Sequence, residues 1–223
     1  FGGASRDFRP AFAPDGTVYV IYINSDLLFG ETQLSDGFQA VSHPEFVIDS
    51  QGVFHAVWLR QGEPYSLEYR SSLDNGQTWS EAERLTDDQS PADFPLSLWA
   101  DRQGQVHLVW FADDMAYYRR WTAETGWEPA MKLLPGKMDN SCGRAMLTGD
   151  DHLHLAWQGG SGLFYLEQTD SLTWQPPRLI TEDICNFDSP ALAVDSLGYR
   201  HFVWNRVSDD TRDFYYAMLP AGE

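Results

Sequence analysis

A short unit that ends in an aromatic residue recurs along this chain and constrains its fold more than any other feature. Four copies read DSQGVFHAVW (49–58), DRQGQVHLVW (101–110), TGDDHLHLAW (148–157) and DSLGYRHFVW (195–204). A shorter relative, PDGTVYVIY (14–22), has Tyr19 and Tyr22 at the His and Trp positions. The closing aromatic residues are spaced on average by about 40–50 residues, which is typical of a four-stranded repeat unit.

Each copy predicts four short strands joined by tight turns. An apolar strand and an Asp/Gly turn precede the strand with His-x-x-Trp, and an aromatic-rich strand and a second turn lead to a fourth. Because no segment has a helical period, the pattern predicts an all-β fold. Sheets repeated radially protect their edges. We therefore expect a single β-propeller domain (1–223) of about five four-stranded blades, at 10–41, 44–85, 95–134, 143–181 and 190–219.

The last copy ends after its third strand, at YYAML. We expect residues 1–6 to complete this blade, so that pairing of the N- and C-terminal strands closes the ring. A piece excised from a larger ring is the alternative that the sequence leaves open. The chain begins at Phe1 without a signal-peptide pattern, which is typical of a mature or excised form.

The charge balance narrows the range of partners. Lys and Arg total 15 against 33 Asp and Glu, a formal net charge of −18. Nucleic acids and anionic membrane surfaces attract basic proteins, so neither is expected as the main partner. The longest apolar run, VYVIYI, is too short to span a membrane, and we expect no membrane insertion. An extracellular or cell-surface location fits this composition.

The segment SSLDNGQTWSE (71–81) lies between two predicted strands. Asp and Ser side chains bind nearby backbone amides in turns, Gly accepts positive φ, and Trp packs between sheets. The structural residues of this hairpin are expected to be Ser72, Asp74, Gly76, Thr78 and Trp79. None of them is a nucleophile paired with a base.

This motif resembles the Asp-box, or BNR repeat, of sialidases and many other bacterial β-propellers. Degenerate versions occur at 121–127, 169–174 and 34–38. In that family the Asp-box is a structural hairpin remote from the active site. The resemblance therefore implies a sialidase-like propeller fold without implying an activity.

Binding residues are expected on the loops that enter the first strand and leave the second strand of each blade, because both reach one face around the channel. These positions differ between copies while the framework repeats. The candidate ligand-binding residues of this upper face are Arg9, His43, Arg60, Asp93, Asp113, Arg144, Asp188 and Arg206.

The repeated histidines and tryptophans have structural interpretations. One His per blade cannot form a single metal site, so we expect each to be hydrogen-bonded within its blade, with no metal and no cofactor. Each Trp that ends a second strand either fills the wedge between blades or stacks on a sugar, and its place after an apolar run favours packing. Cys142 and Cys185 precede adjacent blades and form either a cross-blade disulfide or two buried thiols.

The segment Phe8-Arg9-Pro10 resembles the Phe/Tyr-Arg-Ile-Pro signature of sialidases, without its Ile. The resemblance implies that Arg9 grips a substrate carboxylate. No Tyr/Glu nucleophile pair or further Arg of the family triad is assigned, and the family usually has six blades.

Three functions follow from these observations. The sequence favours a non-catalytic module that recognises a glycan or a protein through its upper-face loops. The first alternative is a sialidase-like exo-glycosidase that uses Arg9 and carboxylates near the channel, Asp26 among them. The second alternative is a structural propeller domain of a larger protein.

Overall fold

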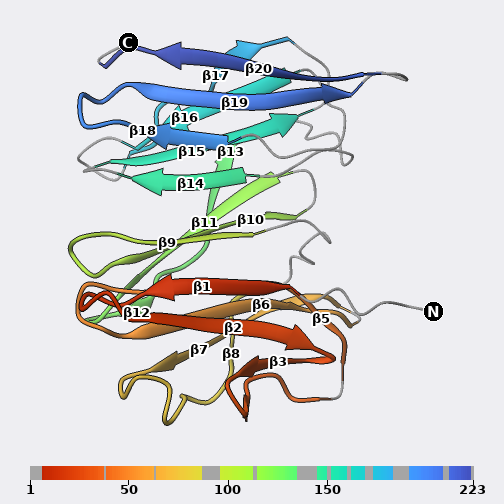
Figure 1. The fold of residues 1–223 in the computed structure, drawn as a ribbon, viewed down its shortest axis with the longest axis vertical. Helices are drawn as coiled ribbons and strands as arrows, with labels where there is room; N and C mark the ends of the chain where they lie inside the picture. The colour runs from red at the N-terminus through yellow and green to blue at the C-terminus, as the bar shows by residue number, and fades with distance from the viewer. Residues whose placement is uncertain are drawn as a thin grey trace. The chain divides into compact units, whose positions relative to one another are not determined.

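All regular structure in the described part of the chain is β-strand. The computed structural model describes residues 7–37, 39–62, 64–86, 96–112, 115–134, 145–149, 152–159, 162–168, 173–182, 191–207 and 211–221. The strands form five small antiparallel sheets (Figure 1). One sheet corresponds to each sequence copy, which confirms the all-β prediction.

Within each sheet the strands are hydrogen-bonded in chain order, except that β12 and β13 both pair with β11. The first sheet comprises β1 (Phe8–Phe12), β2 (Val18–Asn24), β3 (Asp26–Phe29) and β4 (Thr32–Gln33). The second comprises β5 (Val41–Ile48), β6 (Phe54–Arg60), β7 (Ser66–Ser72) and β8 (Glu83–Arg84). The third comprises β9 (Ser97–Ala100), β10 (Val106–Ala112), β11 (Met115–Thr122), β12 (Gly126–Trp127) and β13 (Met131–Leu134). The fourth comprises β14 (Ala145–Gly149), β15 (Leu153–Gly159), β16 (Gly162–Glu167) and β17 (Arg178–Thr181), and the fifth β18 (Ala191–Val194), β19 (Arg200–Val207) and β20 (Arg212–Leu219).

The chain forms two compact units. The first consists of 1–93, 98–108 and 119–130, and the second of 94–97, 109–118 and 131–223. The expected closing strand, 1–6, lies outside the described residues, as do Cys142 and Cys185. Ring closure and a single domain therefore stay predictions.

The core of the first unit is an aromatic cluster between the first two sheets. Phe54 of β6 is fully buried, and its ring lies 4.7 Å from Tyr19, 5.9 Å from Phe29 and 5.6 Å from Phe46 between centroids. Edge-to-face geometry at these separations stabilises aromatic pairs beyond their area burial. Strand β6 is buried along nearly its whole length because it is a central strand covered on both faces.

The 71–81 loop is held by the side chains that the sequence indicates. Ser72 Oγ donates to Asp74 Oδ1 at 2.8 Å and accepts from the Gly76 amide at 2.8 Å. Asp74 accepts from the Thr78 amide at 2.8 Å and from the Thr78 hydroxyl at 2.6 Å. The Trp79 ring packs on the aromatic cluster, 5.6 Å from that of Phe29. The loop thus ties the β7–β8 connection to the core between two sheets.

Gly76 is required at the tip of this loop for two reasons. Its φ of +82° is strained for residues with a side chain, and a Cβ would come within 2.2 Å of the Phe29 ring. A larger residue must therefore displace both the turn and the aromatic cluster.

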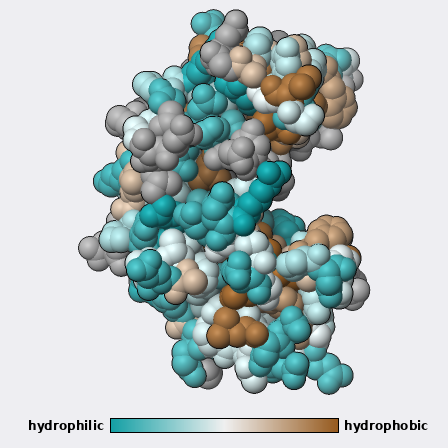
Figure 2. Space-filling model, turned by 90° about the vertical axis from the view of Figure 1, so that its left-hand side faces the viewer, coloured by the Kyte–Doolittle hydropathy of each residue, from teal (hydrophilic) through white to brown (hydrophobic). Residues whose placement is uncertain are grey.

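The core of the second unit lies between the fourth and fifth sheets. Ala156, Leu163 and Tyr165 pack there with buried side chains of β18 and β19. Figure 2 shows one face of the molecule, where hydrophilic side chains predominate and hydrophobic ones gather in a few patches. In the described residues, no helix is long and apolar enough to cross a membrane.

Candidate functional site

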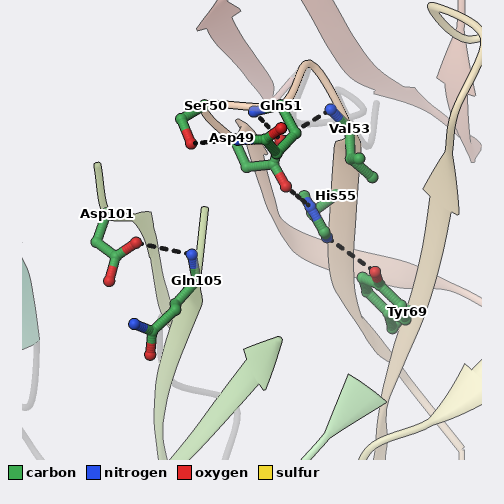
Figure 3. Close-up of polar contacts among 8 residues, drawn as sticks. All are labelled: Asp49, Ser50, Gln51, Val53, His55, Tyr69, Asp101 and Gln105. Atoms are coloured by element: carbon green, nitrogen blue, oxygen red, sulfur yellow. Dashed lines mark hydrogen bonds and ion pairs between the residues drawn. The ribbon is translucent and has the colours of Figure 1, made fainter. Parts of the chain in front are cut away.

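In three of the sheets the repeated His is in hydrogen-bond contact with an Asp that lies six residues earlier in the chain. In the second sheet, Asp49 accepts from the amides of Gln51 and Val53 at 2.8 and 2.9 Å, and its other oxygen lies 3.3 Å from His55 Nε2 (Figure 3). His55 Nδ1 lies 2.8 Å from the Tyr69 hydroxyl. These contacts confirm that His55 is hydrogen-bonded within its own sheet.

Burial and hydrogen bonding determine the protonation states of Asp49, His55 and Tyr69. Burial lowers the pKa of His55 more than Asp49 raises it. Burial also raises the pKa of Tyr69, so its hydroxyl keeps its proton. Burial opposes ionisation of Asp49 as well, but the hydrogen bonds from His55 and the turn amides outweigh it and lower the pKa of Asp49. Tyr69 therefore donates to neutral His55, which donates to the Asp49 carboxylate.

The same arrangement recurs in the third and fifth sheets. Asp101 lies 3.2 Å from His107 Nε2, and Asp195 lies 3.2 Å from His201 Nε2. Among the residues that the structure describes, no three His, Cys, Asp or Glu side chains are grouped so that they could hold a metal ion. The repeated histidines are structural.

The fourth sheet has a variant of this network that superficially resembles a nucleophile pair. Tyr165 donates to Glu167 Oε2 at 2.6 Å, and Arg200 Nε donates to the Tyr165 hydroxyl at 3.1 Å. Tyr165 is 3% exposed and Arg200 4%. Burial, and next Glu167, strongly raise the pKa of Tyr165. A buried, protonated phenol has no access to substrate, so this cluster is structural.

The first two upper-face candidates lie on neighbouring strands, Arg9 on β1 and His43 on β5. Arg9 Nε donates to Glu45 at 3.1 Å, so this guanidinium is already paired with a carboxylate of the next sheet. His43 has a φ of +49° at a β-bulge between Ser42 and Glu45. Its Nδ1 lies 3.1 Å from Ser42 Oγ, which also accepts from Gln61.

The remaining candidates contribute little to a described site, apart from Arg60. Arg206 lies on β19 opposite Asp213, and its side chain is outside the description. Four further candidates lie outside the described residues altogether: Asp93, Asp113, Arg144 and Asp188.

Arg60 lines a pocket of the first unit. The pocket has a volume of about 110 Å³ and is lined by Leu34, Asp36, Trp58, Arg60, Glu68, Arg70 and Ala82. The pairing of β6 with β7 puts Trp58 opposite Glu68 and Ala56 opposite Arg70, so the Trp, Glu and both Arg side chains share one face of the second sheet. Asp36 comes from the segment after β4 and lies 3.3 Å from Arg60 NH2.

Beside this pocket the second sheet departs from the third, fourth and fifth sheets at one position. In the third, fourth and fifth sheets the equivalent Trp is stacked on an aromatic ring of the neighbouring strand. These pairs are Trp110–Tyr117 at 5.4 Å, Trp157–Phe164 at 5.5 Å and Trp204–Tyr215 at 5.8 Å. In the second sheet this neighbour of Trp58 is Glu68. A carboxylate replaces the ring that covers the Trp elsewhere.

Arg70 is a second departure from the other copies. Its counterpart two residues after Tyr117, Arg119, donates to the backbone carbonyls of Leu85 and Glu128, each at 2.6 Å. Arg70 has no hydrogen-bond or ion-pair partner within the described residues, and its Nε is buried. Burial of this Nε without a hydrogen-bond partner is unfavourable, and a ligand that accepts a hydrogen bond from it would remove that cost.

Glu68 also has a carboxylate oxygen that is available to accept a hydrogen bond from a ligand. Ser66 Oγ donates to Glu68 Oε1 at 2.7 Å, which leaves Oε2 without a partner among the described side chains and backbone groups. Trp58 is only 2% exposed, so it is an apolar wall rather than an open stacking platform. The pocket therefore combines guanidinium donors, carboxylate acceptors and an apolar surface.

The sequence already contains the signal for this site. The third strands SLEYRSS, AYYRRW, LFYLEQ and DFYYAM align at a Tyr, which is Tyr69, Tyr118, Tyr165 and Tyr216. The residue before this Tyr is Glu68 in SLEYRSS and aromatic in the other three. The predicted upper-face loops do not include Glu68 and Arg70, which lie on β7, or Asp36, which lies in the segment after β4.

Comparison with known proteins places the fold among propeller-type structures. No protein-family model matches the chain, and no curated protein matches it. A protein of unknown function from Dyadobacter fermentans is similar with a TM-score of 0.65 and 13% identity, over 96% of this chain and 76% of that one. The BP39L lectin from Burkholderia pseudomallei is similar with a TM-score of 0.62 and 11% identity, over 92% and 68%. A Hadza microbial sialidase is similar with a TM-score of 0.53 and 13% identity, over 96% and 56%. At these identities the likeness concerns the fold.

Proposed function

We propose that this chain is a non-catalytic carbohydrate-binding module whose site is the pocket of the second sheet. We also propose that it is a five-bladed, sialidase-like β-propeller, that its 71–81 loop is an Asp-box and that it acts outside the cell or at its surface. The repeat, the five sheets and the structural similarity to a lectin and a sialidase support this proposal.

One observation carries the proposal. Glu68 stands where the third, fourth and fifth sheets stack an aromatic ring on their Trp, and Arg70 beside it has no partner among the residues that the structure describes. Polyhydroxylated ligands need donors and acceptors in a small space with an apolar wall, which this pocket supplies. Its volume of about 110 Å³ suits part of one sugar unit, with the rest of a glycan outside.

A sialidase-like exo-glycosidase is the alternative function with a specific observation in its favour, the position of Arg9 at the start of the first sheet. The ion pair between Arg9 and Glu45 argues against it, because Glu45 offsets the positive charge that would attract a substrate carboxylate. Recognition of a protein, or a purely structural role, is expected if no glycan binds.

A glycan array with purified wild type and matched variants tests the proposal. Glu68→Tyr installs the aromatic residue of the sister repeats and should abolish binding without loss of fold. Arg70→Gln should weaken binding, whereas Arg102→Gln on an exposed turn should not. Arg9→Ala should leave binding unchanged. Binding lost only with Arg9→Ala would instead support the sialidase-like site.

A further inference from the structure

We infer that the sugar unit in this pocket is electrically neutral, with two adjacent hydroxyl groups and an apolar C–H face, and that one such unit binds per chain. This inference rests on the proposed function and names the ligand class of the same site. It departs from what the Arg9 motif implies, which is an acidic sugar.

The charges that line the pocket are balanced. Two guanidinium groups, Arg60 and Arg70, face two carboxylates, Asp36 and Glu68. Asp36 neutralises Arg60, and the charges of Arg70 and Glu68 offset each other, so the lining has no net positive charge that could compensate an anionic ligand for its lost hydration. A neutral hydroxylated ring adds no charge. The balance therefore selects against carboxylated and sulfated sugars.

Free hydrogen-bonding capacity points to adjacent hydroxyl groups. Glu68 Oε2 accepts only, and the Arg70 guanidinium donates only. Each has no partner among the described residues. A hydroxyl group both donates and accepts, so two neighbouring hydroxyls can donate to Glu68 and accept from Arg70 at once. Both side chains lie on the same face of β7, two residues apart.

The apolar part of the lining favours a C–H face. Leu34, the ring carbons of Trp58 and the Ala82 methyl group supply apolar atoms to the lining of the pocket. Burial of ring C–H groups there is favourable, whereas burial of a hydroxyl without a partner is costly. The wall therefore orients the ring with its hydroxyls toward Glu68 and Arg70.

The other described sheets do not repeat this site. Trp110, Trp157 and Trp204 are each stacked by an aromatic neighbour in place of Glu68. We therefore expect a stoichiometry of one sugar unit per chain.

Isothermal titration calorimetry with a panel of methyl glycosides tests the inference. The panel contains neutral hexosides and deoxyhexosides, the matching uronic acids and methyl sialoside, each at low and high salt. We expect a neutral glycoside to bind one per chain, with an affinity that changes less than about twofold with salt. Glu68→Gln should weaken it by about tenfold or more, because the charged acceptor is lost.

Each outcome separates the inference from the function on which it rests. If an acidic glycoside binds more tightly and Glu68→Gln strengthens it, the neutral-ligand inference is wrong but the carbohydrate-binding function stands. A stoichiometry of several units per chain overturns the single-site inference in the same way. If no glycoside and no array glycan binds the folded wild type, the proposed function itself fails. Arg102→Gln, which must bind like wild type, controls for non-specific effects of charge.

Discussion

The His55 network predicts a large loss of stability when its central residue is replaced. His55→Phe keeps an aromatic ring in the site but removes both hydrogen bonds. It leaves the Tyr69 hydroxyl and the Asp49 carboxylate buried, at 3% and 2% exposure, without their partner. Each orphaned buried group costs about 1–3 kcal/mol. We therefore expect the free energy of unfolding to fall by about 2–5 kcal/mol.

Urea unfolding followed by tryptophan fluorescence measures this loss, since the chain has nine Trp. Tyr69→Phe should lose less, about 1–2 kcal/mol, because only His55 Nδ1 is then unpaired. The double variant should lose less than the sum of the two single variants, because the phenol is no longer left as an orphan. A loss below about 0.5 kcal/mol for His55→Phe would refute the reasoning.

Three further perturbations test the fold. Burial lowers the pKa of His55 in the folded state, so below an unfolded pKa of 6.5 the unfolded chain takes up the proton and the folded chain does not. Stability should therefore fall as the pH drops from 7.5 to 5.5, and His55→Phe should flatten the slope; an equal slope in both proteins would contradict this. Gly76→Ala should lower the free energy of unfolding, measured by thermal unfolding, by about 1–3 kcal/mol, which is more than the loss for Gly52→Ala. Both glycines have positive φ, but only at Gly76 would an added Cβ contact an aromatic ring, that of Phe29. Equal losses in the two variants would show that the contact with Phe29 is unimportant. Arg119→Leu should lower the free energy of unfolding by about 2 kcal/mol or more, because two backbone carbonyls lose their hydrogen-bond donor. Arg102→Gln should change the free energy of unfolding very little. Comparable losses in the two variants would argue against the inter-strand role of Arg119.

The regular features of this protein were predictable because they repeat. Five copies of one strand-and-turn unit with Asp/Gly turns predict strands wherever they occur, and five sheets result. The histidines and tryptophans were interpretable for the same reason, since a residue repeated in four of the five copies must be satisfied within its own sheet. Likewise, Ser72 and Asp74 bind amides within four residues of themselves.

The site was not predictable in this way because it depends on contacts between sheets. Arg9 matches a catalytic signature, but the sequence does not show that Glu45, on another strand, pairs with it. Asp36 reaches Arg60 from the preceding sheet, across a separation that no local pattern encodes. Glu68 was visible as an exception in the aligned repeats, but its meaning depends on its pairing with Trp58.

A crystal structure of the complex with the best neutral glycoside tests the central claim most directly. We predict the sugar ring in the pocket of the second sheet, with adjacent hydroxyls bound to Glu68 and Arg70 and its C–H face against Trp58. A sugar bound beside Arg9, or on any other sheet with this pocket empty, would contradict the account.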